Sequence, residues 1–175
     1  MWDMTLANQK KITLREIVLY GLLGALMTAS QVAMSALPNI HIVGVLVLLC
    51  AQVFGLRAMY PVYVFVVLEI LIFGMGLWAI NYLYVWAILV LIGVVLKKTH
   101  AGRLGWAVAA GVFGMLFGAL CAIPQYFLGG WSMVFAYWIS GIPYDLIHGA
   151  ANFALTLVLL PPLRKMAQHV LRQET

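Results

Sequence analysis

The stretch from residue 78 to residue 98, WAINYLYVWAILVLIGVVLKK, decides the fold. Its first 19 residues carry no charge. A helix of that length rises about 28 Å, close to the ~30 Å thickness of a bilayer's hydrocarbon core. Lys97 and Lys98 follow the apolar run directly. A long apolar run that ends in basic residues predicts a helix that crosses a membrane.

The composition of the whole chain agrees with that prediction. Of the 175 residues, 65% are hydrophobic and only 9% are charged, whereas a soluble domain carries about 25% charged residues. Such a chain has too few polar residues to cover a water-facing surface, so a soluble enzyme is excluded. We expect an all-α integral membrane protein.

Basic and turn-forming residues divide the chain into six apolar stretches. We expect transmembrane helices at about 17–36, 42–56, 59–73, 78–96, 104–127 and 143–160. The apolar segment Trp131–Ser140 is flanked by glycines and Pro143, and it predicts either a short interfacial helix or an extension of the sixth span. The chain is thus expected to form one six-helix domain over residues 1–175, with cytoplasmic tails at about 1–15 and 162–175.

The basic residues assign the two sides of the membrane. They lie before the first stretch, between the second and third, between the fourth and fifth, and after the sixth: Lys10, Lys11, Arg15, Arg57, Lys97, Lys98, Arg103, Arg164, Lys165 and Arg172. The loops 37–41, 74–77 and 128–142 contain none. Because short loops rich in Lys and Arg stay cytoplasmic, we expect six spans with both termini in the cytoplasm. The net charge of +5 therefore indicates topology rather than binding of nucleic acid.

Other features have structural explanations. Thr13 and Glu16 fit a capping box at the start of the first helix. Cys50 and Cys121 fall inside spans and outside any metal-ligand spacing, so we expect buried thiols. Trp2, Trp106 and Trp131 are expected at the membrane interface. No nucleotide-binding or catalytic motif is present, so we expect no enzyme activity, no metal site and no cofactor in this chain.

Three polar residues of the sixth span are candidates for function. Asp145, His148 and Asn152 have the spacing i, i+3, i+7, which places them on one face of a helix. Ionisable groups in hydrocarbon are costly, so they are retained mainly where they act. Asp145 precedes Arg164 by about 28 Å of helix, which puts it near the outer surface.

Other polar groups gather toward the same side. Glu69 follows Arg57 by about 18 Å of helix, and Asn39 and His41 belong to the outer loop 37–41. After the turn predicted at Gly74-Met75-Gly76 come four aromatic and amide residues, Trp78, Asn81, Tyr82 and Tyr84. We favour a pocket that opens outward to a flat, polar, heteroaromatic ligand. Hydrogen bonding between helices and an aromatic interface belt are the alternatives.

Small residues form stripes on two of the expected helices. The first stripe is Gly21, Ala25, Ala29 and Ala33, and the second is Ala110, Gly114, Gly118 and Ala122. Such stripes let two helices approach closely in lipid. Packing within the molecule and docking of a partner both explain them, and we place a partner on the first stripe.

Together with the topology, several short motifs resemble the S-component of an energy-coupling-factor (ECF) vitamin importer. They are the Ala25-x-x-x-Ala29 pattern, the segment Leu37-Pro38-Asn39-Ile40-His41, the loop Gly74-Met75-Gly76-Leu77-Trp78 and the segment from Asp145 to Asn152. In this family the alanine pattern meets a transmembrane coupling subunit, and the first loop caps the substrate. The resemblance covers nearly the whole chain.

The resemblance implies a substrate-binding subunit in the cell membrane of a prokaryote. It would capture a vitamin from outside and deliver it inward by toppling in the membrane, driven by ATP hydrolysis in two partner ATPases. The loops resemble most those of cobalamin-type members, and a folate, a pyridoxine or a queuosine-type base is the alternative. Two other classes stay open, namely a small intramembrane enzyme that uses Asp145 and His148, and an assembly subunit without a ligand.

Overall fold

The computed structural model describes residues 12–172, and this part of the chain is 89% helix with no strand. The α-helices are α1 (Leu14–Ala33), α2 (Val43–Phe54), α3 (Met59–Phe73), α4 (Leu77–Lys98), α5 (Arg103–Ala122) and α6 (Tyr126–Arg172). Two 3-10 turns, η1 (Gly55–Ala58) and η2 (Ile123–Gln125), join α2 to α3 and α5 to α6. The all-α prediction is therefore confirmed for the described residues.

Four stretches of the described chain are long and apolar enough to cross a membrane. They are Leu14–Ala33, Val43–Phe73, Leu77–Lys98 and Arg103–His169. The second contains α2, η1 and α3, and the fourth contains α5 and α6. Large apolar side chains such as Leu22, Leu71 and Leu146 are more than half exposed on the outside, where water would make their exposure unfavourable. These features indicate a protein embedded in a membrane.

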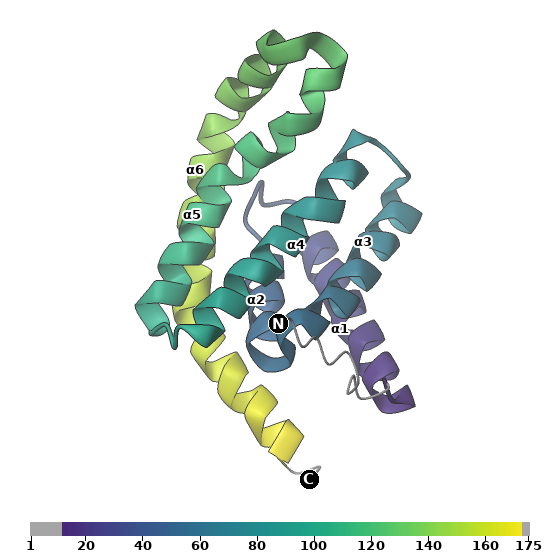
Figure 1. Ribbon diagram of the computed structural model, residues 1–175, viewed down its shortest axis with the longest axis vertical. Coiled ribbons are helices and arrows are strands. Elements are labelled where there is room, and N and C mark those ends of the chain that lie inside the picture. The colour runs from purple at the N-terminus through teal and green to yellow at the C-terminus, as the bar shows by residue number, and fades with distance from the viewer. Residues whose placement is uncertain (1–11, 173–175) are drawn as a thin grey trace, which may run out of the picture.

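The ends of the helices fall into two groups. The start of α1, the η1 turn, the α4–α5 loop and the end of α6 lie in the lower half of Figure 1, whereas the α3–α4 loop and the α5–α6 turn lie at the top. The lower segments carry every Lys and Arg of the described residues. Lys10 and Lys11 lie outside the residues that the structure describes. At the start of α1 the predicted capping box is present, because Glu16 N donates to Thr13 Oγ1 and Thr13 N donates to Glu16 Oε2.

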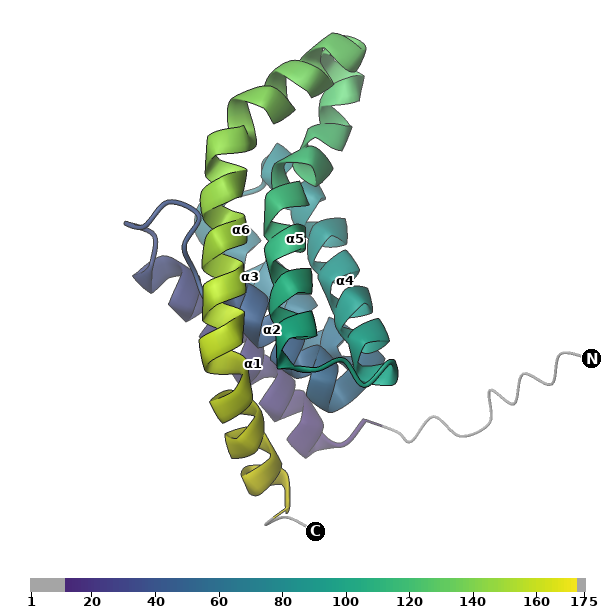
Figure 2. The same ribbon diagram turned by 90° about the vertical axis from the view of Figure 1, so that its left-hand side faces the viewer.

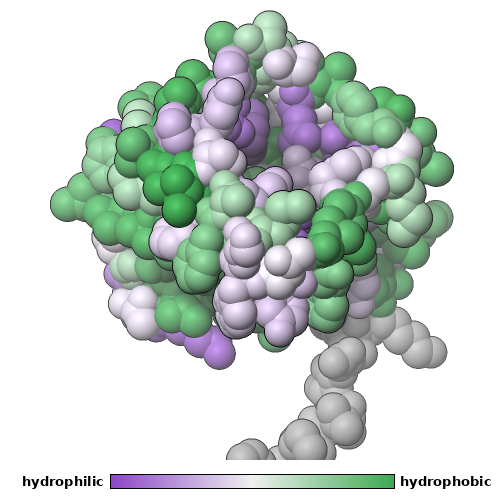
Figure 3. Space-filling view, turned by 90° about the horizontal axis from the view of Figure 1, so that it is seen from above, coloured by the Kyte–Doolittle hydropathy of each residue, from purple (hydrophilic) through white to green (hydrophobic). Residues whose placement is uncertain are grey.

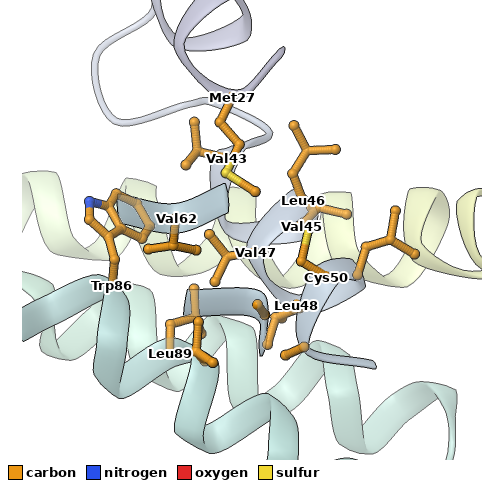
Figure 4. Close-up of a cluster of buried hydrophobic side chains, with 14 of the residues drawn as sticks. Met27, Val43, Val45, Leu46, Val47, Leu48, Cys50, Val62, Trp86 and Leu89 are labelled. Atoms are coloured by element: carbon orange, nitrogen blue, oxygen red, sulfur yellow. The ribbon is translucent and has the colours of Figure 1, made fainter. Parts of the chain in front are cut away.

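Helix α2 lies at the centre of the bundle. Every residue from Val43 to Ala51 is buried, as expected for a helix that is apolar on all sides. Figure 4 shows its side chains packed against Met27 of α1, Val62 of α3, and Trp86 and Leu89 of α4. This core fixes the relative positions of the four helices that surround the site described below.

Helices α5 and α6 lie side by side along their length (Figures 1 and 2). A Cβ atom on Gly114 would lie 2.8 Å from the Cα atom of Gly149, and one on Gly149 would lie 3.0 Å from the carbonyl oxygen of Gly111. Only glycine allows two backbones to approach this closely. Helix α6 therefore packs on the stripe of small residues on α5, within the molecule.

The structure corrects the expected ends of the last two spans. Helix α5 ends at Ala122 rather than near 127, and α6 has its non-helical break at Gly129 and Gly130, with φ 63° at Gly130. Beyond the break the helix continues through Pro143 to Arg172. The segment 131–140 is thus an extension of the sixth helix, and the helix also includes residues 162–172.

Pro161 shows why this long helix tolerates proline. Proline has no N–H group, so the carbonyl oxygen of Leu157, four residues earlier, loses its usual partner. Arg103 Nε of α5 donates to that oxygen at 2.8 Å. A side chain of the neighbouring helix thus supplies the missing hydrogen bond.

The stripe on α1 differs from the stripe on α5. Helix α1 packs on α3 through another face, where a Cβ on Gly24 would lie 2.6 Å from Val64 Cγ1. Ala25, Ala29 and Ala33 are exposed, and a Cβ on Gly21 would meet no atom within 4 Å. Packing within the described molecule therefore does not cover this stripe.

Candidate functional site

Five polar residues expected at a site are almost fully removed from the surface. Their exposed fractions are 2% for Glu69, 5% for Asn81, 6% for Asp145, 2% for His148 and 2% for Asn152. Burial of a polar group without a hydrogen bond costs on the order of 1–3 kcal/mol in proteins. Their hydrogen bonds therefore decide whether each of these groups has a structural explanation.

Glu69 joins three helices at one edge of the site. Gln31 Nε2 of α1 donates to Glu69 Oε2 of α3 at 2.8 Å, and its distance to the Tyr82 hydroxyl of α4 is 3.2 Å. The other carboxylate oxygen, Oε1, is buried without a partner, as is Gln31 Oε1. Two acceptor atoms are thus left facing the interior.

An aromatic wall runs along α4. Trp78, Tyr82 and Trp86 lie one turn apart, and successive ring centroids are separated by 5.2 and 5.5 Å in edge-to-face contact. Phe65 of α3 packs on Trp86 at 5.7 Å. Trp86 Nε1 is buried without a partner, although an indole N–H is normally bonded when buried. The wall therefore presents both flat apolar surface and a donor.

Two histidines from distant parts of the chain meet beside this wall. The ring centroids of His41 and His148 are 5.1 Å apart, and His41 lies 6.2 Å from Trp86. Phe117 of α5 packs on the His148 ring at 4.8 Å. Burial lowers the pKa of the His41 imidazole to about 4, so this ring is neutral at pH 7. Both nitrogens of His148 and Nδ1 of His41 are without a partner.

Asp145 and Asn152 extend the site along α6, and glycine makes room for each. Gly118 N donates to Asp145 Oδ1 at 2.9 Å, and a Cβ atom on Gly118 would overlap this carboxylate. A Cβ on Gly44 of α2 would lie 2.6 Å from Asn152 Oδ1. Asp145 Oδ2 and both amide atoms of Asn152 are buried without a partner. The expected helix face therefore points inward, between α2 and α5.

These residues together form what we call the inner cluster: Gln31, His41, Glu69, Tyr82, Trp86, Asp145, His148 and Asn152. It draws on the loop before α2 and on α1, α3, α4 and α6. Seen from above in Figure 3, the upper end of the molecule is hollowed, and hydrophilic residues are visible inside the hollow. Unpartnered polar atoms in a concave, aromatic-lined interior are typical of a small-molecule site.

Two of the expected site residues have structural explanations instead. The Tyr84 hydroxyl lies 3.1 Å from Asn81 Oδ1 and donates to the Leu120 carbonyl oxygen at 2.6 Å. Asn81 therefore helps to join α4 to α5. Asn39 has a left-handed backbone, with φ 57°, a conformation that asparagine adopts more readily than most residues. Trp78 remains beside the inner cluster through its contact with Tyr82.

Sequence reasoning missed Gln31, Phe65, Trp86 and Phe117. Trp86 carried a signal, because Trp78, Tyr82 and Trp86 repeat every four residues and thus share a helix face. Gln31 gave no such signal, because it is an uncharged polar side chain in a stretch without any Asp, Glu or His between Glu16 and His41. Trp106 was expected at the interface, but it is 3% exposed and its Nε1 donates to the Ala101 carbonyl oxygen.

Neither cysteine contributes to a metal or disulfide site. Cys50 and Cys121 are free and buried. Within residues 12–172, no group of three or more His, Cys, Asp or Glu side chains could hold a metal ion.

Comparisons with protein-family models, with curated proteins and with solved structures find no match for this chain. The fold and the inner cluster define a membrane-embedded, all-helical protein with a buried polar and aromatic site.

Proposed function

We propose that this chain is the substrate-binding subunit of an ATP-driven importer of the ECF type. In this proposal six helices cross the cell membrane of a prokaryote, both termini are cytoplasmic, and the hollowed upper end faces outward. The inner cluster binds a water-soluble vitamin. A transmembrane coupling subunit and two ATPases supply the energy for transport.

The observation that carries the proposal is the set of unpartnered polar atoms in the inner cluster. A purely structural network would have its donors and acceptors paired, because each unpaired buried group is costly. Here Glu69 Oε1, Trp86 Nε1, Asp145 Oδ2 and both nitrogens of His148 are unpaired. A ligand that carries donors and acceptors around an aromatic ring would pair them.

The same geometry argues against the two rival classes. A catalytic histidine is commonly oriented by a hydrogen bond to an aspartate, whereas Asp145 Oδ2 and both nitrogens of His148 are unpartnered. An assembly subunit without a ligand would gain nothing from the unpaired groups. Transport without chemical change is therefore the function that the cluster supports best.

Cobalamin is the first candidate substrate because of the resemblance of the outer loops. A folate, a pyridoxine or a queuosine-type base is the alternative, and the flat aromatic wall along α4 suits such a ring. All four share polar groups around a conjugated system. The ligand itself must therefore be identified by direct screening.

The test is a thermal-shift screen of the purified protein against a vitamin panel, followed by mass spectrometry of the bound compound. A ligand that binds only the native state raises the melting temperature. At a ligand concentration of 100 times its Kd, it adds about 2.7 kcal/mol to the free energy of unfolding. Asp145→Asn should reduce this shift, whereas Tyr144→Phe, on the exposed side of α6, should keep it. A panel that leaves the melting temperature unchanged, or a hit that is chemically converted, would contradict the proposal.

A further inference from the structure

A second cavity lies at the opposite end of the bundle from the inner cluster. It has a volume of about 290 Å³ and lies between α2, α5 and α6, at the small end of the range for ligand sites, about 300–1,000 Å³. Its polar lining comprises Gln52, Arg103, Thr156, Arg164, Lys165 and Gln168. We call this cavity the basic pocket.

The basic pocket gathers positive charge without nearby compensation. Arg103, Arg164 and Lys165 line it, and none of the three acidic residues within 12–172 does. Glu16 instead pairs with Arg57 at 2.8 Å. The topology of a membrane protein explains why cations lie at this end, but it does not explain why three of them converge on one cavity.

The hydrogen bond of Arg103 fixes the position of its guanidinium group. Arg103 Nε donates to the carbonyl oxygen of Leu157, which places the group beside the helical turn that contains Thr156. A guanidinium has five N–H donors in a planar fork, so this bond leaves four for a ligand. Arg164 and Lys165 line the same cavity from a position about two turns further along α6.

Two unpartnered polar atoms line the same cavity. Thr156 is 1% exposed and its Oγ1 has no partner, and Gln52 Oε1 is also buried without one. The threonine hydroxyl can donate a hydrogen bond to an anion, whereas Gln52 Oε1 is an acceptor and would pair with an O–H group of the ligand. The N-cap of α5, Gly102, forms no side-chain capping bond, and the positive end of this helix adds to the field. Among the described residues, the pocket therefore offers several donors and no carboxylate.

We propose that the basic pocket binds a phosphate group. Arginine forks match the geometry of phosphate oxygens, and lysine supplies a further charge. Two sources have this chemistry: the headgroup of an anionic phospholipid, since basic pockets between helices at the cytoplasmic surface bind such headgroups, and a small soluble phosphate. The proposal is independent of the ligand of the inner cluster.

The experiment measures thermal stabilisation of the full-length protein in a non-ionic detergent. One arm adds dioleoylphosphatidylglycerol, with dioleoylglycerol as its phosphate-free control. The other adds inorganic phosphate, with acetate at equal ionic strength as its control. A response to the lipid alone assigns the site to a headgroup, and a response to inorganic phosphate assigns it to a soluble phosphate. If neither the lipid nor inorganic phosphate stabilises the protein more than its control compound does, the proposal is wrong.

Matched variants separate the pocket from general surface charge. The double variant Arg164→Gln, Lys165→Gln should weaken the affinity for the active probe at least about tenfold, because charge-assisted hydrogen bonds are lost. The double variant Lys97→Gln, Lys98→Gln removes the same charge at the same end of the bundle, outside the pocket, and should bind normally. Equal losses in the two double variants would overturn the proposal.

Thr156→Val tests the interior of the pocket without changing any charge. It removes the buried hydroxyl and keeps the shape of the side chain, so the folded state is preserved. We expect several-fold weaker binding of the active probe. Wild-type affinity in this variant would place the anion on the outer surface rather than in the pocket, and would contradict the proposal.

Discussion

At the scale of single residues, the inner cluster combines burial with missing hydrogen bonds. Asn152 illustrates this, since its side chain is 2% exposed and both of its amide atoms lack a partner. Natural proteins retain such groups mainly where function requires them, at a cost in stability. Stability and ligand binding should therefore change in opposite directions when the amide is removed.

Asn152→Leu tests this opposition. Leucine has a similar size and no polar atoms, so the ligand-free protein should become more stable by about 1 kcal/mol. Stabilisation by the ligand found in the screen should be lost. Both effects are measured in one thermal-shift experiment with and without ligand. Ala154→Leu, at an exposed position on the same helix, serves as control. A ligand-free Asn152→Leu protein that is about 1 kcal/mol less stable than wild type would contradict the argument.

His41 makes the stability of the protein depend on pH. Its pKa is lowered by burial to about 4, whereas the unfolded chain has a histidine pKa near 6.5. The unfolded state therefore binds a proton first as the pH falls, and stability that is fully present above pH 6.5 is lost progressively toward pH 4. Because His41 is only partly buried, we expect a loss of about 2 kcal/mol from this residue.

The pH prediction is checked by melting curves of the wild-type protein and His41→Gln between pH 7.5 and pH 4.5. The variant should show a flatter profile, because glutamine does not titrate. His148, whose ring lies 5.1 Å away, remains in both proteins, so the difference between the two profiles reports His41 together with its effect on this neighbour. If the melting temperatures of the two proteins changed in parallel with pH, the pH dependence would come from another group and not from His41.

At the scale of helices, the sequence predicts local features better than contacts between helices. The limits of α3 and α4 follow from glycines and lysines that end the apolar runs, and the structure agrees within about two residues. The Asp145, His148 and Asn152 face follows from helix periodicity. Gln31 was not predicted, because its role depends on the packing of α1 against α3 and α4. The continuation of α6 beyond Pro161 was also not predicted, since Arg103 of another helix compensates for this proline.

The two stripes of small residues give a matched test of helix packing. Gly114→Ala should destabilise the protein by about 1–3 kcal/mol, because the new methyl group would lie 2.8 Å from the Gly149 backbone. Gly21→Ala adds the same group to α1, where no atom lies within 4 Å, and should stabilise the helix by up to about 1 kcal/mol. Denaturant or thermal unfolding of both variants checks the prediction. Equal effects would contradict the assignment of the α5 stripe to internal packing.

At the scale of the whole molecule, the two stripes have different surroundings. Helix α6 covers the stripe on α5, whereas Ala25, Ala29 and Ala33 of α1 remain on the outside. A lipid-facing helix normally carries large apolar side chains, as α1 does at Leu22 and Ile17. A row of small side chains beside them suits close approach of a helix from another subunit, and in the proposed function that subunit is the coupling subunit.

Ala25→Trp adds bulk to this row of small side chains and tests the assembly directly. Since Ala25 is exposed, both folding and ligand binding should be unchanged. Co-purification of the coupling subunit from cells that express the whole importer should fall at least about tenfold, because a bulky side chain prevents close helix approach. Ala154→Trp places the same side chain on the exposed face of α6 and should leave assembly intact. If the coupling subunit still co-purifies with the Ala25→Trp variant, α1 is not the docking helix. If co-purification is lost in both variants, any added bulk on the membrane-facing surface interferes with assembly.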